Sequence, residues 1–287
     1  MLKIRLIALL LIREGICVQS IGFRRYLPVG RPEIAVEFLD SWGIDEIICL
    51  NIDKAGGKAD YFSEIERYAT RCQVPLAIGG GIASVDDAAH IISNGADKVV
   101  INSALINAPD TVEKAARRYG SQSIIASIDC RRDGTGYRVW VNGGRTQTGF
   151  TPSEMARRAQ DLGAGELMIT SIDRDGSKSG YDLALLQEIS ATSNIPVIIA
   201  GGAAKPAHLE EAILAGAEAM AVGNSFHFVE HAPALAKQYL ADRGHNMRMD
   251  SPFRYDDSNT DEFGRILKKD EETLSRLRFI KIEKIVI

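Results

Sequence analysis

Short apolar runs recur along the whole chain, separated by more polar stretches that have the character of helices. The apolar runs are too short for helices of their own, and their continuous hydrophobicity is typical of parallel strands buried on both faces. We expect strands at residues 6–11, 46–50, 76–78, 98–101, 124–128, 166–170, 197–200 and 219–222. We expect helices at residues 32–42, 61–72, 85–94, 111–119, 152–162, 182–192, 207–215 and 232–243.

This alternation of strands and helices predicts one parallel sheet, and eight such units predict closure into an α/β (β/α)8 TIM barrel. An internal repeat supports closure, because Gly79-Gly80-Gly81 and Gly95-Ala96-Asp97 reappear as Ala200-Gly201-Gly202 and Gly216-Ala217-Glu218. The repeat indicates two half-barrels, about 1–122 and 123–246. An open doubly wound sheet is the alternative, but its usual glycine fingerprint after the first strand is missing.

Residues 247–287 differ from the barrel in character and are expected to form a C-terminal extension of unknown role. Residues 250–259 have the composition of loops, 270–277 have that of a helix, and 279–287 alternate apolar with charged residues. The extension is expected to be a surface appendage packed on the barrel, and an element that docks a partner is the alternative.

Length, net charge and cysteine content limit the size of the fold and the kinds of partner and cofactor that we expect. The chain has 287 residues with 45% hydrophobic residues, enough for one barrel of about 250 residues and an extension. A net charge of −4 predicts no nucleic-acid partner and no membrane surface. The four cysteines show no metal-ligand or disulfide spacing, so no metal, no cofactor and a reducing cytoplasm are expected. The apolar run near the N-terminus is expected to be the first strand, with a signal peptide as the alternative.

Small and polar residues follow several of the expected strands, where a barrel of this type carries its reactive face. Glycine turns expose backbone N–H groups, and the start of a helix behind them favours an anion. Since two such turns are related by the repeat, we expect two phosphate sites on opposite sides of the barrel mouth; a plain tight turn is the alternative for each. The expected phosphate-binding residues are Gly81, Asn102, Ser103, Asp175, Gly176, Gly202, Gly223 and Asn224.

Asp129, at the end of the fifth expected strand, is the candidate general acid/base. An enclosed carboxyl group there can have a pKa close to neutral, although a structural hydrogen-bond acceptor is the alternative. At the other end of the barrel, Arg5, Glu46, Lys98 and Glu166 lie at the first residues of strands or next to them. These four charges are expected to form either a structural cluster of ion pairs or a gate into the barrel.

Residues 1 to about 246 resemble the cyclase subunit of imidazole glycerol phosphate synthase. The resemblance rests on segments 79–82, 95–99, 101–102, 127–129, 170–176, 178–182 and 226–228. It implies a barrel that binds a phosphorylated small-molecule substrate and a glutaminase subunit, which docks at the N-terminal face. It further implies that ammonia passes through the barrel, with Arg5, Glu46, Lys98 and Glu166 as its gate.

Four positions depart from that family. Leu11 replaces one of two catalytic aspartates, Gln19 replaces a lysine, Asn51 an aspartate and Ala200 a serine. Because leucine cannot transfer a proton, the cyclase chemistry is expected to be altered or lost. The chain is then similar to a paralogous subfamily that is thought to feed ammonia to a sugar amidotransferase in surface-polysaccharide biosynthesis. The alternatives are a genuine cyclase subunit of histidine biosynthesis and a non-catalytic scaffold that binds phosphorylated sugars.

Overall fold

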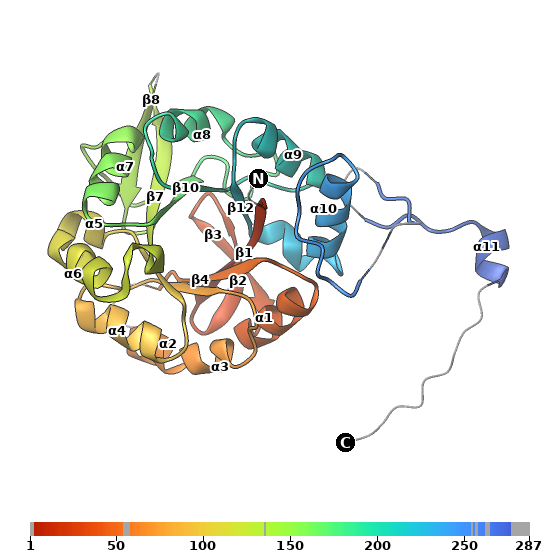
Figure 1. The fold of residues 1–287 in the computed structure, drawn as a ribbon, viewed down its shortest axis with the longest axis horizontal. Helices are drawn as coiled ribbons and strands as arrows, with labels where there is room; N and C mark the ends of the chain where they lie inside the picture. The colour runs from red at the N-terminus through yellow and green to blue at the C-terminus, as the bar shows by residue number, and fades with distance from the viewer. Residues whose placement is uncertain are drawn as a thin grey trace.

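A closed barrel of parallel strands forms the centre of the molecule (Figure 1). The computed structural model describes residues 3–53, 58–134, 136–253, 255, 258–261 and 265–276. Each barrel strand pairs in parallel with the next, and the last pairs with the first, which confirms the predicted TIM barrel. The barrel strands are β1 Arg5–Arg13, β4 Glu46–Asn51, β5 Leu76–Gly79, β6 Lys98–Ile101, β7 Ile124–Asp133, β10 Glu166–Ser171, β11 Val197–Ala200 and β12 Ala219–Val222.

Helices surround the barrel as an outer layer (Figure 1). Local sequence signals account for several of their starts: Ser84 and Thr151 form capping boxes with Asp87 and Glu154, and proline begins other helices. The larger helices are α1 Pro32–Ser41, α4 Val85–Ser93, α6 Pro109–Tyr119, α7 Pro152–Asp161, α8 Leu183–Ser190, α9 Pro206–Leu214 and α10 Ala232–Ala241. The shorter elements are α2 Lys58–Ser63, α3 Ile65–Ala69, α5 Ala104–Asn107, η1 Ser121–Ser123 and η2 Asn224–His227.

Two expectations about local structure were wrong. The single helix expected at 61–72 is two short helices, α2 and α3, which meet at Glu64. The segments after β1 and β7 are antiparallel hairpins, where no strands were expected. They contain β2 Ile16–Ile21 and β3 Arg25–Gly30 in one half, and β8 Gly136–Val141 and β9 Thr146–Gln147 in the other. Both hairpins extend strands that the internal repeat relates to each other, so each half-barrel carries one.

Alternate residues of every barrel strand face the barrel interior, because side chains alternate across a strand. One buried apolar cluster fills this interior and is separate from the larger cluster between strands and helices. The interior cluster consists of Ile7, Ile48, Ala77, Val100, Ile125, Met168, Ile198, Ala200, Ala219 and Ala221. The same alternation places Arg5 and Leu11 on the inward face of β1, below and above Ile7.

A buried ion pair joins the last large helix to the N-terminal side of the barrel. The Lys237 ammonium lies 2.5 Å from a carboxylate oxygen of Asp45, and both side chains are at most 5% exposed. The other Asp45 oxygen accepts the backbone N–H of Leu6 at 2.8 Å. Burial lowers the pKa of Lys237, while Asp45 opposes that shift. Asp45 therefore ties β1 and α10 together at one point.

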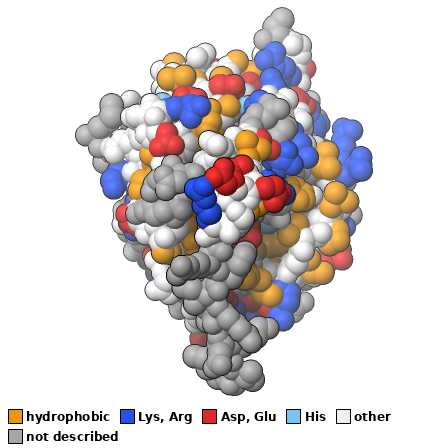
Figure 2. Space-filling view, turned by 90° about the vertical axis from the view of Figure 1, so that its right-hand side faces the viewer, with side chains coloured by type: hydrophobic (Ala, Val, Ile, Leu, Met, Phe, Trp, Pro, Cys, Tyr) orange, Lys and Arg blue, Asp and Glu red, His pale blue; other side chains and the backbone are white. Residues whose placement is uncertain are grey.

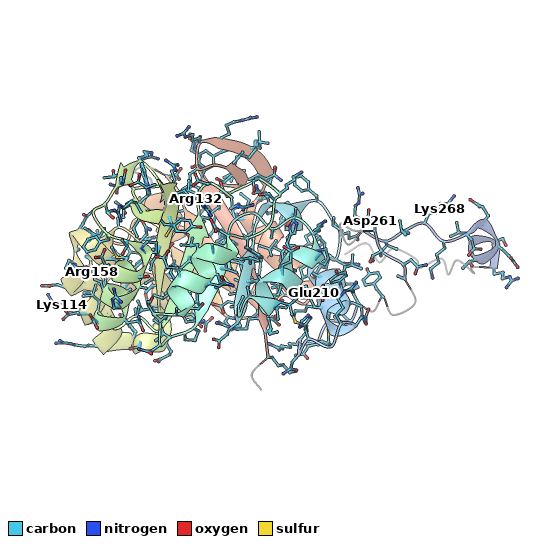
Figure 3. The ribbon with its side chains drawn as sticks, turned by 90° about the horizontal axis from the view of Figure 1, so that it is seen from above. Lys114, Arg132, Arg158, Glu210, Asp261 and Lys268 are labelled. Atoms are coloured by element: carbon cyan, nitrogen blue, oxygen red, sulfur yellow. The ribbon has the colours of Figure 1, made fainter. Side chains whose placement is uncertain are left out.

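The C-terminal extension begins against the barrel. Met247 bridges to Ile4, Ser251 packs against Gly43, and the ring of Phe253 stacks on that of His231 at 3.8 Å. Farther on, a segment with Asp261, Lys268 and the short helix α11 Glu271–Arg276 leads away from the barrel (Figure 3). The helix expected at 270–277 is confirmed within its described part, whereas residues 279–287 lie outside the described residues.

The visible surface on the side of the extension mixes hydrophobic side chains with charges of both signs (Figure 2). This face shows no broad patch of one charge, which agrees with the small net charge of −4. Among the described residues, no helix is long and apolar enough to cross a membrane.

Replacing Asp45 should destabilise the fold strongly. Asp45→Ala leaves the Lys237 ammonium buried without its counter-ion, a change that typically costs about 3–5 kcal/mol. We expect the free energy of unfolding, measured by urea denaturation, to fall by that amount. Glu37→Ala is the control, because the Glu37–Arg71 pair is about half exposed and should contribute at most about 1 kcal/mol. Equal losses in the two variants would contradict this account.

Candidate functional site

The barrel mouth holds a cavity of about 910 Å³ at the C-terminal ends of the strands. All eight residues predicted to bind phosphate line it, and Asp129 lines it with them. The lining residues include two groups: a first glycine cradle of Gly80, Gly81, Asn102 and Ser103, and a second glycine cradle of Gly176, Gly202, Gly223 and Asn224. Asp175 precedes Gly176 of the second cradle and lines the cavity as well. The cavity is large enough for a ligand of metabolite size.

Asp129 is buried at the cavity wall. Its carboxylate accepts a hydrogen bond from the Asn102 side chain at 3.2 Å, and Asn102 also donates to the Ser127 carbonyl at 3.0 Å. Burial raises the pKa of Asp129 to about 7, the negative charge of Asp175 adds to the rise, and the Asn102 hydrogen bond opposes it. A carboxyl group with this pKa can give or take a proton near neutral pH.

Leu11 lies at the position on β1 that corresponds to Asp129 on β7, and its side chain lines the cavity. Leu9 and Leu50 also line the cavity, and Leu50 is the partner of Leu11 in the strand pairing, so this wall of the mouth is apolar. Asp53 lines the cavity as well, but both of its oxygens accept the Glu14 backbone N–H at 3.0 Å. Asp53 is thus held by the backbone of the loop after β1, and the position on β1 that corresponds to Asp129 carries leucine instead of an acid.

The other three altered positions lie in different surroundings. Asn51 lines the cavity, and its side-chain oxygen accepts the backbone N–H of Asp53. Ala200 belongs to the interior cluster below the cavity. Gln19 is buried but does not line the cavity, because on β2 it alternates with Val18 and Ser20, which do. The Gln19 side chain therefore points away from the site where the resemblance would place a lysine.

The hairpin of β2 and β3 is attached to the second glycine cradle. The Asn224 side chain exchanges two hydrogen bonds with the Ser20 backbone, at 2.7 and 3.1 Å. The Asp175 carboxylate accepts the Ser20 hydroxyl at 2.6 Å and the Phe23 backbone N–H at 3.2 Å. Burial raises the pKa of Asp175, and these hydrogen bonds oppose the rise. Both side chains are thus already engaged by the hairpin.

The hairpin of β8 and β9 is attached to the first glycine cradle in a similar way. The Ser103 hydroxyl donates to the Asn142 side chain at 3.3 Å and accepts its backbone N–H at the same distance. Gly144 in this hairpin lies against Phe23 of the other, since a Cβ atom built there would be 3.1 Å from the Phe23 ring. The two hairpins therefore meet over the mouth.

Glycine is required at the turn of each cradle. A Cβ atom on Gly80 would lie 2.2 Å from the Asn51 carbonyl oxygen, and φ is +105° there. One on Gly202 would lie 2.1 Å from the Gly180 carbonyl oxygen, with φ at +104°. Only glycine combines this space and this conformation, so both turns keep their backbone close to the cavity.

The four charged side chains at the opposite end form a closed ring. Arg5 lies 2.8 Å from Glu46 and 2.7 Å from Glu166, and Lys98 lies 3.0 and 2.9 Å from the same two acids. Each acid is held by both bases, and Glu46 is only 2% exposed. All four residues face inward on their strands, so the ring closes the barrel below the interior cluster.

Several cavity residues were missed from the sequence. Tyr26 and Arg145 reach the mouth from the two hairpins, and Lys178 reaches it from the loop after β10. Burial raises the pKa of Tyr26, Asp175 adds to the rise, and Arg145 opposes it. Lys178 belongs to one of the segments that carry the family resemblance, but nothing in the sequence indicates its left-handed backbone, with φ at +61°. Among the described residues, no group of three or more His, Cys, Asp or Glu side chains is arranged to hold a metal ion.

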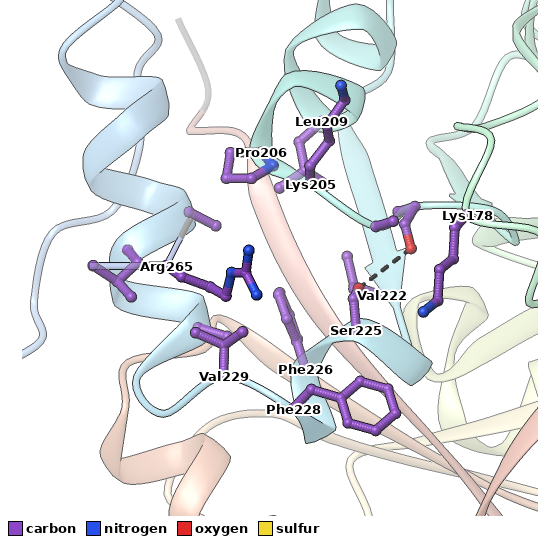
Figure 4. Close-up of a pocket in the computed structure, with 15 residues that line it drawn as sticks. Lys178, Lys205, Pro206, Leu209, Val222, Ser225, Phe226, Phe228, Val229 and Arg265 are labelled. Atoms are coloured by element: carbon purple, nitrogen blue, oxygen red, sulfur yellow. Dashed lines mark hydrogen bonds between the residues drawn. The ribbon is translucent and has the colours of Figure 1, made fainter. Parts of the chain in front are cut away.

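A smaller cavity of about 290 Å³ borders the second glycine cradle (Figure 4). Lys178 and Ser225 line both cavities, and the Ser225 hydroxyl donates to the Ala203 carbonyl at 3.3 Å. Arg265 reaches this cavity from the extension, where Asp261 pairs with its guanidinium at 2.7 Å. Among its described residues, the extension therefore contributes Arg265 to this smaller cavity.

Comparisons with known proteins agree with this architecture. The family model described as histidine biosynthesis protein matches residues 5–232. The imidazole glycerol phosphate synthase subunit HisF of Thermococcus gammatolerans is 39% identical over 251 residues, which cover 87% of this chain and 100% of the relative. Subunits of the same name are 39% identical in Pyrobaculum aerophilum, over 83% of this chain and 94% of theirs, and in Caulobacter vibrioides, over 88% and 98%.

The burial of Asp129 should make stability depend on pH. Its pKa of about 7 exceeds that of the unfolded chain, so the folded state loses stability relative to the unfolded state as pH rises from about 4 to 7. Asp129→Asn removes this loss. Relative to the unchanged protein, its free energy of unfolding should rise by roughly 3–4 kcal/mol between pH 4 and pH 8.

Denaturant unfolding at several pH values measures this difference. Ser127→Ala, at the previous inward position of β7, is the control, because it removes no titrating group and its effect should not vary with pH. A difference between the Asp129→Asn and unchanged proteins that stays constant with pH would contradict the prediction.

Proposed function

This chain belongs to the histidine biosynthesis protein family, and we propose that it acts as the cyclase-type subunit of an imidazole glycerol phosphate synthase. Ammonia from a glutaminase partner reaches a bisphosphorylated substrate held in the mouth cavity. The observation that carries the proposal is Asp129, a buried carboxyl group with a pKa near 7 that faces a cavity with a glycine cradle on either side.

The two cradles support a ligand with a phosphate at each end. Both offer a strained glycine turn close to the cavity, and the repeat relates them across the mouth. Because Asn224 and Asp175 are engaged by the hairpin, we assign the phosphate contacts of the second cradle chiefly to backbone N–H groups. Arg145 and Lys178 line the same cavity and add positive charge to it.

Asp129 is assigned the proton transfer. Joining ammonia to the carbonyl carbon expels the carbonyl oxygen as water, and closing the imidazole ring breaks a C–N bond and expels the aminoimidazole-carboxamide part as an amine. Protons must leave the incoming nitrogen and reach each departing group. A group with a pKa of about 7 is present in both protonation states at neutral pH and can serve both steps. Leu11 contributes no proton, so in this proposal Asp129 acts without a second acid on β1.

The charged ring is assigned the passage of ammonia. It closes the N-terminal end of the barrel, and above it lies the apolar interior cluster, which includes four small alanine side chains. Neutral ammonia crosses such an interior more easily than ammonium, because burying an unpaired charge is costly. A glutaminase docked at this end would deliver ammonia directly to the ring.

A second candidate function is the transfer of ammonia to a different acceptor, a sugar amidated in surface-polysaccharide biosynthesis by a separate amidotransferase. Leu11 favours it, because the charged ring is retained while the corresponding acid is not. The third candidate function is that of a non-catalytic scaffold that only binds phosphorylated sugars. The names of the relatives support the histidine-type subunit at least as well.

Turnover with ammonium distinguishes these functions. The purified chain is given the bisphosphorylated aminoimidazole-carboxamide ribulosyl substrate and a high concentration of ammonium, so that no glutaminase is needed. We expect formation of imidazole glycerol phosphate at a rate that Asp129→Asn lowers by about 10²–10⁴-fold. Leu11→Asp should raise the rate, because it adds an acid on the opposite wall of the cavity.

Binding of the same substrate, measured by calorimetry, is the control for both variants. If neither the unchanged chain nor Leu11→Asp turns over a substrate that binds, ring closure is wrong and transfer to another acceptor is favoured. Binding without any ammonia transfer in the complex would favour the scaffold.

Opening the charged ring should affect turnover with glutamine as the ammonia source differently from turnover with added ammonium. Lys98→Met removes the base that holds Glu46 and Glu166 together on one side of the ring. We expect glutamine-supported turnover in the complex with the glutaminase to fall several-fold, whereas turnover supported by added ammonium should stay unchanged. Lys114→Met, on an exposed face of α6, is the matched control. Equal losses with both sources would contradict the assignment of the ring.

A further inference from the structure

Trp140 stands directly opposite Asp129 in the antiparallel pairing of β8 with β7. Residues opposite each other in such a pair share one face of the sheet, with Cβ atoms about 4.5–5.5 Å apart. The indole and the carboxyl group are therefore neighbours on the inward side. The Arg131 guanidinium stacks on the indole at 4.5 Å from the ring centre and pairs with Asp173 at 3.5 Å.

The indole N–H of Trp140 is buried and has no acceptor. Among the described residues, only this atom and the amide nitrogen of Gln19 are buried side-chain N or O atoms without a hydrogen-bond partner. Buried donors are nearly always paired, so an unpaired one beside an acid/base candidate calls for a functional reason. The Asp129 side chain accepts a hydrogen bond from Asn102 on one oxygen only.

We propose that Trp140 is a positioning residue for Asp129, whose indole N–H is held ready for the carboxylate that forms when Asp129 gives up its proton. The inference deepens the proposed function and rests on it, because it takes Asp129 as the group that transfers the proton. Trp140 is not among the residues that line the cavity, so its effect on the reaction is exerted through Asp129.

Trp140 has two opposing effects on the acid. Its ring excludes water from Asp129, which favours the neutral carboxyl group, and its N–H favours the charged one once that is formed. The other groups that act on Asp129 are Asn102 from the end of β6 and Asp175 from the loop after β10. Tyr26 and Arg145 face the same cavity from the two hairpins.

The two effects can be separated by two substitutions. Trp140→Phe keeps an aromatic ring and removes the donor, so the pKa of Asp129 should rise, by about one unit. Trp140→Ala admits water, so the pKa should fall. The pKa is measured in the full chain without substrate, from the carboxyl ¹³C resonance of Asp129. Trp42→Phe is the control. It changes the other of the two tryptophans of the chain, at the C-terminal end of α1, and should leave the pKa of Asp129 unchanged.

A second measurement needs no change at Trp140. In the Trp42→Phe protein the fluorescence reports Trp140 alone, and it should titrate with the midpoint of Asp129. The same titration should be absent after Asp129→Asn. This readout carries the test even where Trp140→Ala fails to fold.

Three outcomes would overturn the inference: an unchanged pKa in Trp140→Phe, a lowered pKa in that variant, or fluorescence that does not follow Asp129. Because no measurement uses turnover, the inference and the proposed function fail separately. Shifts as expected in a chain without ring-closing activity would leave Trp140 assigned and remove the proposed function. Ring-closing turnover without these pKa shifts would support the proposed function and remove the role of Trp140.

Discussion

The hydrogen-bonded register of the eight parallel strands is the constraint on which the rest of the molecule depends. It fixes which residue of each strand faces inward, and a slip by one residue would turn every inward side chain outward. In this register Arg5, Ile7 and Leu11 share one inward column on β1, and Asp129 lies inward on β7, near the end of the part that pairs within the barrel. One geometric condition thus places the charged ring at one end, the apolar cluster in the middle and the acid at the other end.

The register also explains how the charged ring is tolerated. Four ionised groups at the end of a buried interior are costly unless each is paired, since water is largely excluded there. Here each acid contacts both bases at 2.7–3.0 Å, so neither Glu46 nor Glu166 depends on a single partner. A ring paired in this way closes the barrel without filling its interior, so the four residues stabilise this end and, in the proposed function, also serve the passage of ammonia.

The sequence predicted the barrel strands and their order well, because each is a continuous apolar run, and a run of that kind has few alternatives to burial in a parallel sheet. It also singled out Asp129 and the residues of the two cradles as candidates, because their signals are local: a carboxylate or glycines directly after an expected strand. The hairpins were missed, since 16–30 and 136–147 mix polar and apolar residues without a clear period. Gln19 and Trp140 could not be placed for the same reason, because their directions follow from hairpin pairing between separate segments.

The hairpins also change how the two cradles must work. Three side chains that the sequence assigned to phosphate binding, Asn224 and Asp175 on one side and Ser103 on the other, are occupied by the hairpins. An ionised carboxylate such as that of Asp175 would also repel a phosphate. Its hydrogen bond to Ser20 is therefore more favourable than a contact with a phosphate would be. What remains for an anion is backbone N–H groups at turns that only glycine can form, together with Arg145 and Lys178. In the proposed function, the cradles therefore select for charge and for the spacing between the two ends of a ligand, while Asp129 and the apolar wall around Leu11 act on its centre.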